Sequence, residues 1–71
     1  MRIKIFEPVR KVFVVVLNGS RGFSKSFSVP ANGLLDLANF ADGSEKIEVH
    51  APRIEHPEYA GRKVQWCNVA P

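Results

Sequence analysis

The sequence predicts a small α+β domain over residues 1–71: a mostly antiparallel β-sheet, in the order β-ββ-α-ββ, covered by one short helix. Segments that alternate polar and apolar residues, or that are rich in valine and phenylalanine, lie on both sides of one segment with helical spacing. A chain of 71 residues has room for one domain, and a composition of 45% hydrophobic and 24% charged residues is typical of a globular chain rather than a disordered one.

The N-terminal half predicts three strands. Residues 2–6 alternate polar and apolar side chains and end before Pro8, which cannot donate to a β-ladder. Residues 12–17 are almost all β-branched or aromatic, which favours a strand. Residues 23–29 alternate strictly, and the following side chains share one face: Phe23, Lys25, Phe27 and Val29. Because residues 18–22 contain two glycines, we expect a turn that joins the last two segments into a hairpin.

The C-terminal half predicts the helix and two further strands. Six apolar residues in the segment 34–42 cover a wide arc at helical spacing, with Asn32 as a plausible N-cap and Gly43 as a left-handed residue after the helix. Residues 46–51 return to strict alternation, with every second side chain apolar and directed inward. Residues 63–69 are expected to form the last strand.

The strand at 12–17 is apolar on both faces, and one helix covers only one face of a sheet. A tight turn would oppose Val14 to Phe23, whereas a five-residue loop would oppose Phe13 to Phe27, and the sequence leaves both registers open. In either register an apolar row lies on the face that the helix does not reach. Loops or strong coiling of the sheet would enclose this row, or it would serve as a contact surface for a second copy or another macromolecule.

Positive charge is concentrated in the N-terminal part of the chain. Residues 1–30 hold six basic residues and one acidic residue, whereas residues 31–71 hold four basic and six acidic residues. This asymmetry suits a polyanionic partner. Alternate side chains of a strand emerge from one face at steps of about 7 Å, which lets bases stack on rings while cations meet phosphates. The candidate residues for binding nucleic acid or another partner are Arg10, Lys11, Arg21, Phe23, Lys25 and Phe27.

The tripeptide Arg21-Gly22-Phe23 resembles the start of one signature of the RRM family of RNA-binding domains, and residues 12–14 resemble the start of its other signature. The later aromatic positions of the first signature are occupied by Lys25 and Ser28 here. A turn, rather than the helix of that family, separates the two segments. We therefore do not assign the chain to this family.

Residues that carry catalysis or bind metals are few. Cys67 is the only cysteine, so an intramolecular disulfide and a four-cysteine zinc site are excluded. His50, His56 and Cys67 do not have the spacing of known ligand sets, and no phosphate-binding loop or nucleophile elbow is present. We expect no enzymatic activity, no cofactor, no metal and no small-molecule substrate. The longest apolar run has six residues, too short for a membrane span, and we expect a cytoplasmic protein.

Taken together, these features predict a small non-enzymatic binding module that contacts nucleic acid or a nucleoprotein through its basic N-terminal hairpin. The alternative is a protein-binding inhibitor or adaptor, of the phage or prophage accessory type, that occludes a surface of a host protein. A homodimer is compatible with either reading, since small chains often gain stability from association.

Overall fold

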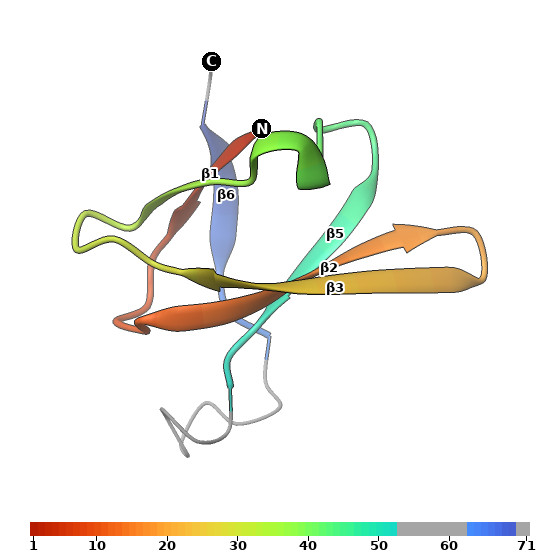
Figure 1. Ribbon diagram of the computed structural model, residues 1–71. Helices are drawn as coiled ribbons and strands as arrows, with labels where there is room; N and C mark the ends of the chain where they lie inside the picture. The colour runs from red at the N-terminus through yellow and green to blue at the C-terminus, as the bar shows by residue number, and fades with distance from the viewer. Residues whose placement is uncertain (53–62, 70–71) are drawn as a thin grey trace.

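Two antiparallel sheets, each of three strands, enclose the core (Figure 1). The computed structural model describes residues 1–52 and 63–69. Its strand orders are β4-β1-β6 in one sheet and β3-β2-β5 in the other. Along the described residues the elements are β1 (Arg2–Ile5), β2 (Lys11–Asn18), β3 (Arg21–Ser28), β4 (Leu34–Asp36), the 3₁₀ turn η1 (Ala38–Phe40), β5 (Lys46–His50) and β6 (Trp66–Val69).

The hairpin of β2 and β3 has a register that differs from both sequence alternatives. Val12 lies opposite Phe27 and Val16 lies opposite Phe23, so the loop consists of Gly19 and Ser20 alone. Gly19 has a φ of +63°, which suits the first position of a tight hairpin turn. The valines of β2 therefore share a face with the phenylalanines of β3, which is the grouping that the tight-turn alternative predicted.

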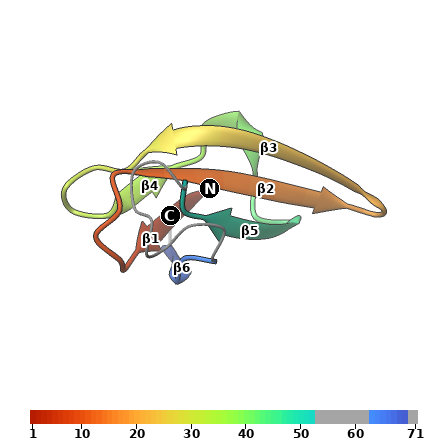
Figure 2. The same ribbon diagram turned by 90° about the horizontal axis from the view of Figure 1, so that it is seen from below.

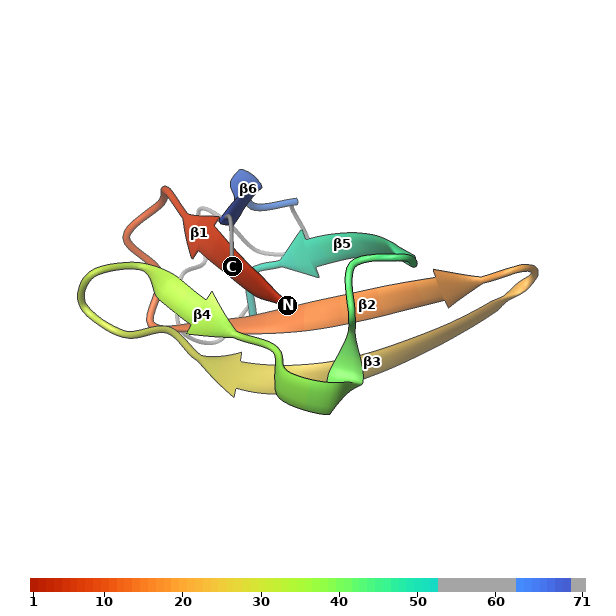
Figure 3. The ribbon, with the colours of Figure 1, turned by 90° about the horizontal axis from the view of Figure 1, so that it is seen from above.

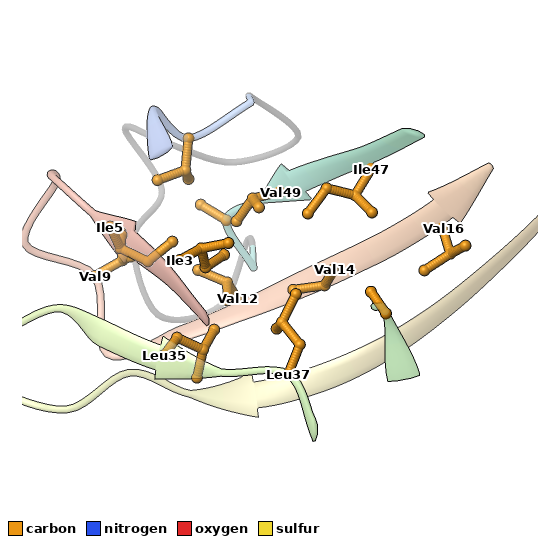
Figure 4. Close-up of a cluster of buried hydrophobic side chains, with 13 residues drawn as sticks. Ile3, Ile5, Val9, Val12, Val14, Val16, Leu35, Leu37, Ile47 and Val49 are labelled. Carbon is orange, nitrogen blue, oxygen red and sulfur yellow. The ribbon is translucent and has the colours of Figure 1, made fainter. Parts of the chain in front are cut away.

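The core lies between the two sheets, as the labelled side chains of Figure 4 show. Val12 and Val14 of β2 are fully buried, as is Ile3 of β1. Each such side chain contributes roughly 1.5–3 kcal/mol when it leaves water. The complete set of buried apolar residues is Ile3, Ile5, Val9, Val12, Val14, Val16, Leu35, Leu37, Ala41, Ile47, Val49, Ala51 and Val64.

The helix predicted over residues 34–42 is wrong, and with it the α+β class. Leu35 and Leu37 are buried while Asp36 between them is exposed, which is the period of a strand. Helical structure in this segment is limited to η1, whose first residue, Ala38, has a φ of +52°, outside the right-handed helical region. The described residues thus form a mostly antiparallel β structure, in which a second sheet covers the first.

Pairing with β1 explains why the segment is extended. Leu35 lies opposite Ile3, and the N–H of Leu37 donates to the carbonyl of Met1 at 2.9 Å. These bonds satisfy backbone groups that a helix would leave unpaired on this side of β1, and a helix of two to three turns is marginal by itself. The predicted caps have other roles: Asn32 Oδ1 accepts from the N–H of Leu34 at 3.0 Å, and Gly43 has a φ of +98° in the loop before β5.

The other predicted strands are confirmed with small changes at their ends. In the predicted strand over 46–51, Ile47, Val49 and Ala51 are buried as expected. The last strand begins at Trp66, and Lys63 forms only an isolated bridge with His50. Among the described residues, no helix has the length and apolar character needed to cross a bilayer.

Where β1 ends, the backbone conformation and close packing at position 33 require a glycine. Its φ is +77°, and a Cβ there would lie 2.5 Å from the carbonyl oxygen of Ile5. We expect Gly33→Ala to lower the free energy of unfolding by about 3 kcal/mol. Gly19→Ala is the matched control, because Gly19 also has a positive φ but its Cβ would meet no atom within 4 Å. Its expected cost is about 1 kcal/mol. Urea unfolding followed by Trp66 fluorescence measures both, and equal costs would contradict the close approach at Gly33.

The loop before β5 gives a prediction on pH dependence. The Asp42 carboxylate accepts hydrogen bonds from the Ser44 hydroxyl at 2.7 Å and, with a smaller effect, from the Ser44 N–H at 2.9 Å, which lowers the pKa of Asp42 from 3.8 to about 2. Because the pKa is lower in the folded state, this contribution to stability is complete above about pH 4 and is lost as the pH falls towards 2. In Ser44→Ala, a carboxyl NMR titration should place the pKa of Asp42 closer to 3.8. Ser20→Ala serves as the control, and an unchanged pKa in Ser44→Ala would refute the assignment.

Candidate nucleic-acid interface

Strand β3 carries a row of alternating basic and aromatic side chains on one face. Phe23, Lys25 and Phe27 lie opposite the three buried valines of β2, and residues that oppose each other in an antiparallel pair share a face. Arg21 continues the row at the turn, where it lies opposite Asn18. The structure therefore brings together four of the six candidate residues.

The two phenylalanines of this row have different surroundings. Phe23 is 51% exposed. It lies towards the turn of the hairpin, which extends beyond the other strands (Figure 3). Phe27 is half-buried and packs against the core, with its ring centroid 5.8 Å from that of Phe40. The ammonium of Lys25 lies 5.4 Å from the Phe27 centroid, within the range of a cation–π contact. Phe27 thus anchors the row, and Phe23 offers a ring to a ligand.

The two remaining candidates lie elsewhere. Lys11 lies opposite Ser28, and its position in the alternation places it on the outer face of the sheet, away from the row. Arg10 is exposed just before β2, and its carbonyl accepts a hydrogen bond from the N–H of Val29 at 2.7 Å. It lines a hollow of about 480 Å³ between residues 4–10 and residues 29–33. The lining of this hollow contains one carboxylate, that of Glu7, and neither histidine nor cysteine.

The outer face of the same sheet carries the apolar row that the sequence predicts. Phe13 is 41% exposed, and Val15 and Leu17 are half-buried. Gly22 contributes to this arrangement, since a Cβ there would meet the side chains of Val15 and Leu17 at 3.6 Å. Serines of β3 border the row on one side, and the polar side chains of β5 border it on the other.

A charged cluster on β5 lies beside this apolar row. The Glu48 carboxylate contacts His50 Nε2 at 3.0 Å and Lys63 Nζ at 3.2 Å. The hydrogen bond with His50, followed by that from Lys63, lowers the pKa of Glu48 below its ordinary value. The sequence indicated the pair on β5 but not Lys63, which reaches it only through the isolated bridge to His50.

The remaining residues that could bind a metal or carry catalysis are placed as follows. In residues 1–52 and 63–69, no group of three or more histidine, cysteine or acidic side chains is arranged to hold a metal ion. Cys67 is exposed on β6. His56 lies outside the described residues. Phe40 was not singled out from the sequence, because its contact with Phe27 depends on the path of η1.

The unequal burial of the two rings predicts unequal effects on stability. Phe27→Ala should lower the free energy of unfolding by about 2–3 kcal/mol, because it removes a half-buried ring that packs against the core. Phe23→Ala should cost less than about 1 kcal/mol, since half of that residue is already exposed. Thermal unfolding by circular dichroism measures both variants, and a larger loss in Phe23→Ala would show that the two roles are reversed.

No family model, no curated protein and no solved structure matches the chain. The interface is therefore interpreted from its geometry.

Proposed function

We propose that this protein binds single-stranded nucleic acid along the β3 row, which is defined here as Arg21, Phe23, Lys25 and Phe27. The observation that carries the proposal is the exposed ring of Phe23 between two cations on one strand face. An exposed ring stacks on a base whatever the base is, and neighbouring cations meet the phosphates.

The order of the row suits an extended strand of nucleic acid. Successive members are about 7 Å apart, so a ring alternates with a positive charge along the direction of β3. Lys25 is held against the fixed ring of Phe27, which reduces the freedom that it would lose on binding a phosphate. The excess of basic residues in the N-terminal part of the chain strengthens the attraction of a polyanion.

Stacking on Phe23 requires bases that are not already stacked within a duplex. Sequence-tolerant binding to single strands through rings and cations is therefore the mode that this row favours, for RNA or DNA alike. If the partner is a nucleoprotein, its nucleic acid would contact the same exposed strand, β3. The proposal includes the cytoplasmic location expected from the sequence.

Fluorescence anisotropy with labelled single-stranded oligonucleotides of about 12 residues tests this proposal. We expect Phe23→Ala to weaken binding about tenfold, because one base loses its stacking partner. Lys25→Ala should reduce the slope of log affinity against log salt by about 0.7, the value for one phosphate contact on a single strand. Lys46→Ala is the matched control, since Lys46 is an exposed cation on β5 and is not part of the β3 row.

Two results would contradict the proposal. One is the absence of binding at about 50 mM salt, where phosphate contacts are strong. The other is an equal loss of affinity in Lys46→Ala and Lys25→Ala, which would indicate a diffuse effect of charge. A duplex of the same sequence should bind more weakly than the single strand, because its bases are not free to stack on Phe23.

A second candidate function rests on the outer face, where Phe13, Val15 and Leu17 form an apolar row. Partly exposed apolar side chains of this size, bordered by polar residues, are typical of a contact with another protein. This surface would serve the inhibitor or adaptor function, in which the protein covers part of its target. Phe13→Ser should leave oligonucleotide affinity unchanged if the β3 row is the nucleic-acid interface. A loss of affinity would indicate that nucleic acid binds to the outer face instead.

A further inference from the structure

The free edge of β3 is the longest exposed strand edge in the part of the chain that the structure describes. Strand β3 has eight residues and lies at the end of its sheet, with β2 as its neighbour on the other side. It is the outermost strand of that sheet when the molecule is seen from below (Figure 2). Strand edges of this length are templates for pairing with another strand.

The register shows which backbone groups reach this edge. The N–H of Val29 donates to the carbonyl of Arg10, a pair that continues the β2–β3 register by one step. Hydrogen-bonded pairs alternate along an antiparallel ladder, so the odd-numbered residues of β3 bond to β2. The backbone groups of Gly22, Ser24 and Ser26 therefore point to the open edge.

We propose that two copies of this chain associate through β3, antiparallel and with the two-fold axis at Ser24. In this arrangement Ser24 bonds to the partner's Ser24, and Gly22 bonds to the partner's Ser26. The two sheets become one sheet of six strands, in the order β5-β2-β3-β3-β2-β5. The interface is isologous, as in most homodimers.

The charges of the β3 row select this register. With the axis at Ser24, Phe23 lies opposite the partner's Lys25, and Arg21 lies opposite the partner's Phe27. Each cation then faces a ring, an arrangement that is attractive. The axis at Lys25 would set Lys25 against the partner's Lys25, and like charges directly opposite each other are destabilising.

The two other nearby registers are poorer. The axis at Phe23 would oppose Arg21 to the partner's Lys25, again two like charges. The axis at Ser26 would pair only residues 24–28 of β3, whereas the axis at Ser24 pairs all of residues 21–27. Among the registers compared, only the Ser24 register combines pairing over residues 21–27 with complementary side chains.

A cysteine at the axis tests the register directly. In an antiparallel hydrogen-bonded pair the Cα atoms lie about 5.5 Å apart, which a disulfide can span. On a Cys67→Ser background, Ser24→Cys should form a covalent dimer on mild oxidation. Ser26→Cys is the matched control, since its two copies would lie about 13 Å apart along the strands, beyond the reach of a disulfide. Equal crosslinking of the two variants, or none in Ser24→Cys, would overturn the proposal.

Sedimentation equilibrium without nucleic acid tests the role of Lys25. The proposal expects Lys25→Ala to weaken the dimer about tenfold, because two symmetry-related cation–ring contacts are lost. Lysine on a strand edge often prevents association instead. If Lys25 has that role, Lys25→Ala will strengthen self-association, and the proposal is wrong. Because no nucleic acid is present, the result is independent of the proposed binding activity, and Lys46→Ala again serves as the control.

Discussion

Burial of the inner face of β2 is the constraint on which the rest of this structure depends. Strand β2 is central in its sheet, and its valines at positions 12, 14 and 16 are excluded from water. A chain of this size has few other residues with which to build a core. Apolar side chains of β1, β4 and the segment after β4 pack over these valines. The second sheet therefore completes the burial of the inner face of β2.

The same arrangement explains why two surfaces are left for binding. The second sheet encloses the inner face of β2, and none of the strands in residues 1–52 and 63–69 covers the outer face with Phe13, Val15 and Leu17, so Phe13 stays partly exposed. On β3, the β3 row begins against the core at Phe27 and ends in solvent near the turn. The β3 row is therefore supported by the core at Phe27 and accessible at Phe23, a combination that favours binding without a large cost of ordering.

The two proposals share the side chains of the β3 row but differ in their use of the backbone. Nucleic acid would contact the row alone, whereas a second copy would also bond to the backbone groups of Gly22, Ser24 and Ser26. In the dimer, the β3 rows of two copies would lie side by side and present twice the number of rings and cations. Such a surface would hold a longer single strand than one copy does, since each row would meet its own bases and phosphates.

The amino-acid pattern by itself determined the strands at β1, β2, β3 and β5, the inward side of β5, and the grouping of Arg21, Phe23, Lys25 and Phe27, because alternation is a local property of the chain. It did not determine the hairpin register, since turns of different length suit the same residues. The segment at 34–42 was misread for a related reason: its leucines fit a helix and a strand equally well. Only the tertiary structure decided between them, because the free edge of β1 provided backbone partners that no local pattern contains. The same holds for Phe40 and Lys63, which reach Phe27 and Glu48 through contacts between segments far apart in sequence.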